Sequence, residues 1–319
     1  MYQIIVNPGA RSGRGKRNWE KIKKVLDTRE IRYAVHFTGK AGDASEYAST
    51  LYNEALQKEE VLQLIVLGGD GTMNEVMQGL PSFDNLELSC IPVGSSNDLA
   101  RALGISFNPE EAIGHILNSP TSFSMDVGII HCENRSQADS PAKLPDKRFV
   151  VSTGFGYDAA ICAEANASVA KRLLNRLGLG KLIYLIICLK QLASVSNYAV
   201  DITLDDTDKT LHLDNLLFVA GMNNKYEGGG FKFTPDALNN DGLIDLCVVG
   251  GISKPRVLKI LPYAMKGEHL AFDGVDAYRA ASYTIKSAQP LWVHTDGEAD
   301  FMADYIKVTC KNNAIKIIY

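Results

Sequence analysis

The sequence predicts an α/β protein with a doubly wound (Rossmann-like) N-terminal domain, followed by a mainly antiparallel β-sandwich domain with helices. In the first third of the chain, short apolar runs alternate with amphipathic helical patterns, as in a parallel sheet covered by helices. From residue 124 onward, strand patterns dominate. A chain of 319 residues can also bury two separate hydrophobic cores.

The domain boundary is expected between residues 123 and 124. Residues 1–123 form the α/β domain and residues 124–305 the β-rich domain. The tail, residues 306–319, contains two short apolar runs separated by Asn312 and Asn313. We predict a hairpin there, which could return to the first domain.

Composition narrows the classes of protein to consider. Hydrophobic residues make up 46% and charged residues 22%, as is usual for a soluble globular protein. The net charge of −4 argues against a nucleic-acid partner. Six cysteines without C-x-x-C spacing indicate a reducing, cytoplasmic location. Neither a signal peptide nor a membrane span is expected, because the longest apolar run is Leu182–Leu189.

The most informative stretch begins with the apolar run Leu62–Leu67. Gly68, Gly69, Asp70 and Gly71 follow directly, before a helical pattern. Glycines at a strand-to-helix turn leave backbone N–H groups open to a phosphate, and the helix dipole favours an anion there. A purely structural turn would need one or two glycines but no carboxylate. Asp70 therefore indicates a site for a divalent cation or a reacting hydroxyl.

Two motifs resemble those of the diacylglycerol kinase catalytic-domain family, which includes bacterial soluble lipid kinases and is related to sphingosine and ceramide kinases. GGDGTMNE at residues 68–75 resembles the family signature, although NAD kinases and phosphofructokinases share its GGDGT core. PVGSSNDLAR at residues 92–101 resembles the family's P-x-G-T-x-N-D-x-A-R, with Ser95 in place of Thr. The second motif, in this form, separates the family from those two enzymes.

The resemblance implies that the ends of several predicted strands contact ATP. These strands are Tyr2–Val6, Ile31–Phe37 and Leu88–Pro92, besides the run at residues 62–67. The implied nucleotide-binding residues are Asn7, Thr38, Gly68, Gly69, Asp70, Gly71, Thr72, Met73, Asn74 and Ser95. The basic cluster at residues 11–17 could contact phosphate or could be a solvated helix start.

The resemblance also implies metal-binding residues. Residues 230–245 match the family pattern G-G-x-x-x-x-P-x-A-x-x-x-D-G-x-x-D closely, which implies a magnesium ion held by Asp241 and the carbonyls of Leu238 and Leu243. A turn stabilised by Asp241 alone is the alternative. Asp126 resembles the acid that opens the second domain, and it would join Asp70 and Asp98 in a network near the metal. Asp98 could equally cap a helix.

Two acids near the end of a later predicted strand are candidates for the general base. Asp296 and Glu298 follow Leu291–Thr295, with Gly297 between them. The family pattern favours Glu298, but spacing alone does not assign separate roles to two neighbouring carboxylates. His294 and His36 are interpreted as structural or solvated.

A basic helical region suggests contact with a membrane surface. Residues 163–193 carry five basic side chains and one acid, Glu164, around an apolar stripe; the basic residues are Lys171, Arg172, Arg176, Lys181 and Lys190. Such a pattern is typical of a helix that lies on an anionic membrane. The apolar stripe could instead cover the sheet.

Together these observations predict an ATP- and magnesium-dependent lipid kinase that phosphorylates a lipid hydroxyl, by default that of diacylglycerol, to give phosphatidic acid. We therefore expect a cytoplasmic enzyme that makes peripheral, transient contact with the membrane. The sequence leaves open whether the protein forms a homodimer. Two alternative functions remain. The first, an NAD kinase-like enzyme, should turn over the dinucleotide NAD. A non-catalytic nucleotide-binding regulator should bind ATP without acceptor-dependent ADP release.

Overall fold

The computed structural model describes residues 1–118, 120–136, 142–168, 180–207 and 209–319. They form two compact units, residues 1–126 with 313–319, and residues 127–312. The first unit thus ends close to the predicted boundary at residue 123, and the part of the tail that belongs to it is shorter than residues 306–319.

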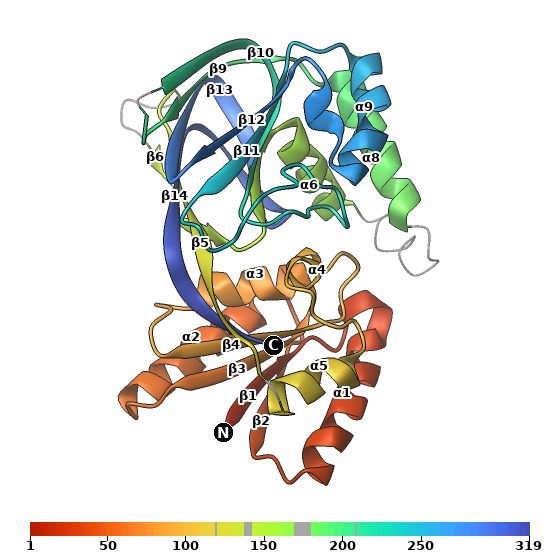
Figure 1. The fold of residues 1–319 in the computed structure, drawn as a ribbon, viewed down its shortest axis with the longest axis vertical. Coiled ribbons are helices and arrows are strands. Elements are labelled where there is room, and N and C mark those ends of the chain that lie inside the picture. Colours follow the sequence, from red (N-terminus) through yellow and green to blue (C-terminus); the bar gives the residue numbers. More distant parts are fainter. Residues whose placement is uncertain (119, 137–141, 169–179, 208) are drawn as a thin grey trace. The chain divides into compact units, whose positions relative to one another are not determined.

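The first unit contains a parallel sheet between helices, as predicted (Figure 1). Its strands are β1 (Tyr2–Val6), β2 (Tyr33–Phe37), β3 (Leu62–Gly68) and β4 (Leu86–Pro92). They lie in the order β2-β1-β3-β4, and the end of β14 (Glu298–Ile318) pairs in parallel with β4. The helices are α1 (Ala10–Thr28), α2 (Asp43–Gln57), α3 (Asp70–Gly79), α4 (Asp98–Ala102) and α5 (Pro109–Asn118).

The apolar runs explain why these strands are central. In β3, the consecutive residues Leu64–Leu67 are all buried, so both faces of the strand are covered. In α1, Trp19, Ile22 and Leu26 are buried at helical spacing and form the face that meets the sheet. The strands β1 to β4 all run in the same direction, and the segments that follow them therefore lie at one edge of the sheet.

The second unit is built from antiparallel strands. They pair in the order β12-β11-β10-β8-β13-β14; β9 pairs with β10 and β13, and β5 pairs with β6, β7 and β14. The strands are β5 (Ser122–Asn134), β6 (Ala142–Lys143), β7 (Lys147–Phe149), β8 (Ser152–Gly156), β9 (Tyr198–Leu204), β10 (Lys209–Met222), β11 (Ile244–Gly250), β12 (Val275–Ala280) and β13 (Ser282–Thr295). A core cluster that includes Phe149, Phe155 and Tyr283 fills the sandwich.

Helices pack against one side of this sandwich (Figure 1). The described ones are α6 (Tyr157–Ala167), α8 (Gly180–Ser194), α9 (Lys254–Lys266) and the short η1 (His269–Ala271). A second core cluster joins Tyr157 and Leu192 of the helices to Phe218 and Cys247 of the strands. The β-sandwich with helices therefore agrees with the predicted fold class.

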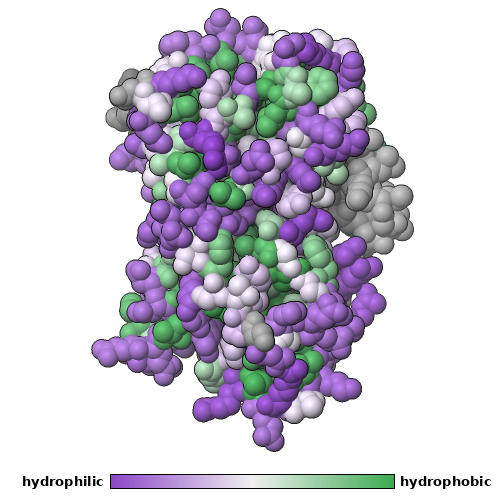
Figure 2. All heavy atoms as spheres, viewed as in Figure 1, coloured by the Kyte–Doolittle hydropathy of each residue, from purple (hydrophilic) through white to green (hydrophobic). Residues whose placement is uncertain are grey.

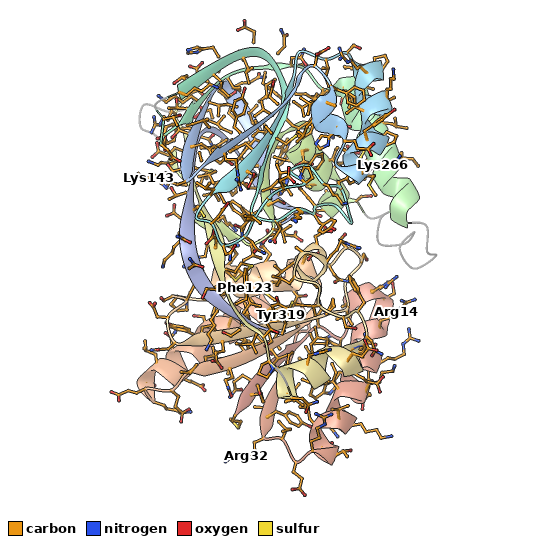
Figure 3. All side chains as sticks on the ribbon, viewed as in Figure 1. Arg14, Arg32, Phe123, Lys143, Lys266 and Tyr319 are labelled. Carbon is orange, nitrogen blue, oxygen red and sulfur yellow. The ribbon has the colours of Figure 1, made fainter. Side chains whose placement is uncertain are left out.

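The predicted hairpin in the tail is wrong. Residues 298–318 form one continuous strand, in which Asn313 adopts a positive φ of 48°. The asparagines suggested a turn, but the N–H of Asn313 donates to the buried carboxylate of Asp126 at 2.6 Å. Beyond this point the strand joins the first unit, where the last residue of the chain, Tyr319 (labelled in Figure 3), lies. Tyr319 exchanges backbone hydrogen bonds with Thr121.

Two other sequence interpretations change. Residues 210–213 and 216–222 each carry a strand pattern, with Asp214 and Asn215 between them, and the sequence alone predicts two strands. They form one strand, β10, with an irregularity after Leu213. The polar segment from Glu133 to Asp146, which contains two prolines, predicts a loop. Instead β5 extends to Asn134 and pairs with β6, while residues 137–141 lie outside the described part of the chain. In both places polar residues occur within a strand without ending it.

Candidate functional site

Polar segments follow the parallel strands at the predicted edge of the first unit. Asn7 comes directly after β1, and its side-chain amide donates to Oγ1 of Thr72, in the first turn of α3, at 3.0 Å. Thr38 comes directly after β2, and its N–H donates to the carbonyl of Val6 at 2.9 Å. The structure therefore brings Asn7, Thr38 and the α3 N-terminus to the same edge.

Two glycine-containing loops approach each other at this edge. Gly69 precedes α3, and Gly94 lies in the loop between β4 and α4. A Cβ built on Gly69 would lie 2.8 Å from the Cα of Gly94, and one on Gly94 would lie 2.5 Å from the Cα of Gly69. Asn97 fixes the second loop, because its side chain accepts from the N–H of Gly94 at 2.8 Å and donates to its carbonyl at 3.0 Å. The glycines are thus needed for backbone contact as well as for any ligand.

Asp70 lies between these loops as the first residue of α3. Burial raises the pKa of its carboxyl, whereas backbone N–H groups of residues 97–99 oppose the shift; the N–H of Leu99 lies 3.5 Å from Oδ1. A cavity of about 20 Å³ is lined by Gly68, Gly69, Asp70 and Asn97, among others. This is room for roughly one water molecule. The N-termini of α3 and α4 therefore both lie beside this carboxylate.

The other predicted nucleotide-binding residues differ in exposure. Thr72, Met73 and Asn74 are buried in α3, whereas Ser95 is exposed on the loop after β4. In the first turn of α1, which is not regular helix, Arg11 and Ser12 hold positive φ values of 45° and 58°. Non-glycine residues adopt this conformation at a cost, and such residues cluster at ligand-binding loops.

The predicted catalytic acids Asp296 and Glu298 lie in the second unit, at the β13–β14 hairpin. Asp296 and Gly297 form its two-residue turn, with φ values of 49° and 84°. The positive φ at both positions is typical of an Asp-Gly hairpin turn. The Asp296 carboxylate accepts from three consecutive backbone N–H groups; the nearest donor–acceptor distances are 3.2 Å for Val150, 2.8 Å for Val151 and 3.1 Å for Ser152. Asp296 therefore anchors the turn to the segment before β8.

Glu298 has a different environment. It begins β14, is only partly buried, and its Oε2 accepts from the side-chain amide of Asn166, on α6, at 3.2 Å. The same amide donates to the carbonyl of Gly297 at 3.1 Å. The two acids that spacing could not distinguish are thus separated by geometry, with Asp296 held by the backbone and Glu298 near the surface.

Comparison with known proteins agrees with both units. The family model described as "Diacylglycerol kinase catalytic domain" matches residues 1–129. The model described as "YegS C-terminal NAD kinase beta sandwich-like domain" matches residues 150–319. The chain belongs to the diacylglycerol kinase catalytic-domain family. The family accounts for a nucleotide-binding α/β domain followed by a β-sandwich.

Individual relatives cover nearly the whole chain. A diacylglycerol kinase of Bacillus subtilis (strain 168) is 28% identical over 301 residues, which are 93% of this chain and 89% of that protein. The solved structure of a diacylglycerol kinase from Bacillus anthracis str. Sterne is 22% identical with a TM-score of 0.69, covering 100% of this chain and 96% of the other. An NAD kinase from Archaeoglobus fulgidus, solved in complex with ATP, is 12% identical with a TM-score of 0.51, covering 100% and 93%. At these identities the two structures show the fold alone.

The acids that the family pattern places near a metal have protein partners here. Asp98 lies 3.8 Å from Nε of Arg101, and Asp126 is fully buried beside the N–H of Asn313. The predicted network of these acids with Asp70 therefore stays a prediction.

The implied magnesium ligand Asp241 is also engaged. Its Oδ1 accepts from the N–H of Leu243 at 3.1 Å, and its Oδ2 accepts from the guanidinium of Arg279 at 2.7 Å. Arg279 contacts Asp245 as well, with Nε 2.9 Å from Oδ1. Each carboxylate oxygen of Asp241 thus accepts one hydrogen bond and keeps a lone pair with which it could ligate magnesium together with the carbonyls of Leu238 and Leu243, so this site stays a prediction.

Asp245 should make the stability of the protein depend on pH. Burial raises the pKa of its carboxyl to about 6, although Arg279 acts in the opposite direction. The folded state thus binds this proton more tightly than the unfolded state, and the stabilisation is present below about pH 4 and lost as the pH rises through about 6. In Asp245→Asn, we expect a smaller fall in the free energy of unfolding between pH 4.5 and 7, measured by urea denaturation. Asp276→Asn, at an exposed position of β12, should leave that fall unchanged; equal effects of the two substitutions would contradict the assignment.

Sequence reasoning missed part of the second unit. The structure buries His294 between Asp158 and Glu227, which agrees with the structural interpretation of this histidine and excludes the solvated one. The sequence pattern does not point to Glu227. Its only sequence signal is its position beside Gly228–Gly230, where an acid adjoins a flexible loop. Its contact with β13 depends on long-range pairing that no local pattern shows.

The surface gives one further fact about membranes. Hydrophilic residues dominate the face seen in Figure 2, with hydrophobic residues scattered among them. Within the described ranges, no helix is both long enough and apolar enough to cross a bilayer.

Proposed function

We propose that this protein is a lipid kinase that transfers the γ-phosphoryl group of ATP to a lipid hydroxyl, with diacylglycerol as the default acceptor and phosphatidic acid as the product. The observation that carries the proposal is the pair of touching glycine loops with Asp70 between them, in a chain of the diacylglycerol kinase family. Diacylglycerol is proposed because relatives that span about nine-tenths of this chain are named diacylglycerol kinases.

The residues of this chain would share the work of phosphoryl transfer. Such a reaction needs phosphate positioning, charge neutralisation and orientation of the attacking hydroxyl. The helix N-termini beside Gly69 and Gly94 are suited to the first task, because their N–H groups favour an anion. Magnesium bound with ATP would supply charge neutralisation. Glu298 would accept the proton of the lipid hydroxyl, while Asp296 holds its turn in place.

An ADP-release assay with ATP and magnesium tests the proposal across a panel of acceptors. The panel contains diacylglycerol, ceramide, sphingosine and NAD. We expect release that depends on diacylglycerol. Release with NAD alone would support the NAD kinase-like alternative, and ATP binding without release for any acceptor would support a nucleotide-binding regulator.

We also propose that α8 contributes to the contact with the lipid surface. Of the basic residues that suggested this contact, Lys171, Arg172 and Arg176 lie outside the described residues. Lys190 pairs with Glu164 at 2.5 Å, so its charge is compensated locally. The support comes instead from apolar side chains, because Ile186 is 50% and Leu189 42% exposed at helical spacing.

Replacing Ile186 and Leu189 together by Ser should weaken binding to vesicles of diacylglycerol and anionic phospholipid by about tenfold, because two half-exposed aliphatic side chains lose their transfer into the bilayer. Co-sedimentation measures the binding. Activity on a short-chain, water-soluble diacylglycerol should be retained. Leu56→Ser, at a 53% exposed position of α2, serves as the control. If the double variant binds vesicles like the control, the contact lies elsewhere.

A further inference from the structure

A buried cluster of three ionisable side chains lies next to the turn that carries Glu298. Nε2 of His294, on β13, is 2.8 Å from Oδ2 of Asp158, at the start of α6, and 3.1 Å from Oε1 of Glu227, in the segment after β10. The His294 side chain is fully buried. A Cβ on Gly154 of β8 would lie 2.3 Å from both Nε2 and Oδ2. Three elements and a required glycine thus build this cluster.

The other ring nitrogen of His294 faces the turn itself. The N–H of Gly297 donates to Nδ1 at 3.2 Å. A backbone N–H can only donate, so Nδ1 is an acceptor and the ring proton sits on Nε2, from which it is donated to the carboxylates. Asp158, Cys162 and His294 do offer ligand-type atoms within 4.8 Å of one another. Because Nε2 is a donor, however, the ring acts here as a hydrogen-bonding bridge and not as a metal ligand.

The polar groups of the turn are therefore held from several sides. His294 accepts from the N–H of Gly297, and Asn166 donates to its carbonyl. Three backbone N–H groups hold the carboxylate of Asp296. Asp158 and Asn166 both belong to α6, so one helix contacts the far side of the imidazole and the near side of the turn.

We infer that His294 is the positioning residue for Glu298: Asp158 and Glu227 orient the imidazole, and the imidazole fixes the Gly297 peptide that precedes Glu298. The inference rests on the proposed role of Glu298 as the base. A displacement of about 1 Å at a reacting group can cost about 10²-fold in rate, so a support of this kind affects kcat more than substrate binding.

The carboxylates of Asp158 and Glu227 favour a proton on Nε2 of His294, the ring nitrogen that faces them. Burial lowers the pKa of His294 and these carboxylates act in the opposite direction, while the Gly297 N–H at Nδ1 disfavours a second ring proton. Burial and the charge of Asp158 raise the pKa of Glu227. The other titratable groups around the cluster are Tyr157 and Cys162 of α6, Cys188 of α8 and Cys247 of β11. Burial raises the pKa of Tyr157, Cys188 and Cys247, so they add no charge near pH 7.

Two substitutions of His294 separate positioning from simple packing. Asn places an amide oxygen near the position of Nδ1 and can accept from Gly297, whereas Gln reaches the position of Nε2 and keeps only the contact with the carboxylates. We expect His294→Gln to lower kcat by about tenfold or more with an unchanged KM for ATP. The Gly297 amide should exchange with solvent about tenfold faster, as befits the loss of one hydrogen bond. His294→Asn should keep both values within about threefold of the parent.

Three results would overturn the inference: equal loss of kcat in the two variants, a change confined to KM, or unchanged exchange of the Gly297 amide in His294→Gln. Should neither variant fold, ¹⁵N NMR of the unmodified protein decides, because a proton on Nδ1, with or without one on Nε2, would exclude the contact with Gly297. Amide exchange and the tautomer do not depend on activity. Failure of the proposed kinase function, seen as no acceptor-dependent ADP release by the parent, is therefore distinguished from failure of this inference.

Discussion

Replacing Glu298 by Gln is expected to lower kcat for diacylglycerol by about 10²-fold or more, with little change in the KM for ATP. The substitution keeps the shape of the side chain and an oxygen for the Asn166 amide, but it removes the carboxylate that would accept the hydroxyl proton. General-base catalysis is typically worth about 10²–10⁴-fold. Steady-state ADP release measures kcat and the KM for ATP, and thermal unfolding verifies that the variant is folded.

Asp296→Asn is the matched control for this experiment. An amide presents one oxygen and an NH₂ group to backbone donors that now share a carboxylate. Buried donors then lose an acceptor, at a cost of about 1–3 kcal/mol, so we expect a lower melting temperature. A loss of kcat in Asp296→Asn without a loss of stability, combined with an active Glu298→Gln, would reverse the roles assigned to the two acids.

Asp70→Asn should also reduce turnover by about 10²-fold or more while the protein stays folded. The side chain faces the backbone N–H groups at the start of α4, beside the loops proposed to hold the ATP phosphates, where its carboxylate would hold the magnesium bound with ATP. Losing the carboxylate would weaken the neutralisation of phosphate charge on which phosphoryl transfer depends, and a loss of this kind costs about 10²-fold or more. The change can be followed by ADP release, with circular dichroism to verify the fold.

Asp84→Asn is a suitable comparison, because Asp84 is an exposed acid in the same unit, where it accepts from the hydroxyl of Ser82. It should leave turnover unchanged. Normal turnover in a folded Asp70→Asn protein would contradict the role of this carboxylate in catalysis.

Local patterns predicted the first unit well. The apolar run at residues 62–67 is buried on both faces, and a strand of that kind followed by glycines has few alternatives to a parallel strand that turns into a helix. The positions of Asn7 and Thr38 at one sheet edge follow from the same logic. Composition and spacing suffice here because each β–α unit is defined by residues close in sequence.

Long-range contacts limited the prediction of the second unit. The different roles of Asp296 and Glu298 depend on N–H groups of residues 150–152, which are more than 140 residues away in sequence. Arg279 reaches Asp241 from a neighbouring strand, and no spacing rule anticipates that contact. Asn312 and Asn313 suggested a turn, although the carboxylate of Asp126 provides a partner that keeps the strand continuous.

The end of β14 has a consequence for how the protein is made. Lys316 and Ile317 pair with Glu87 and Leu88 of β4, although the whole second unit lies between them in sequence. During synthesis, β4 therefore remains an unpaired edge until the ribosome has passed residue 317, and an exposed edge strand can recruit other chains. Exit of these last pairing residues thus determines when the nascent first unit is protected from aggregation.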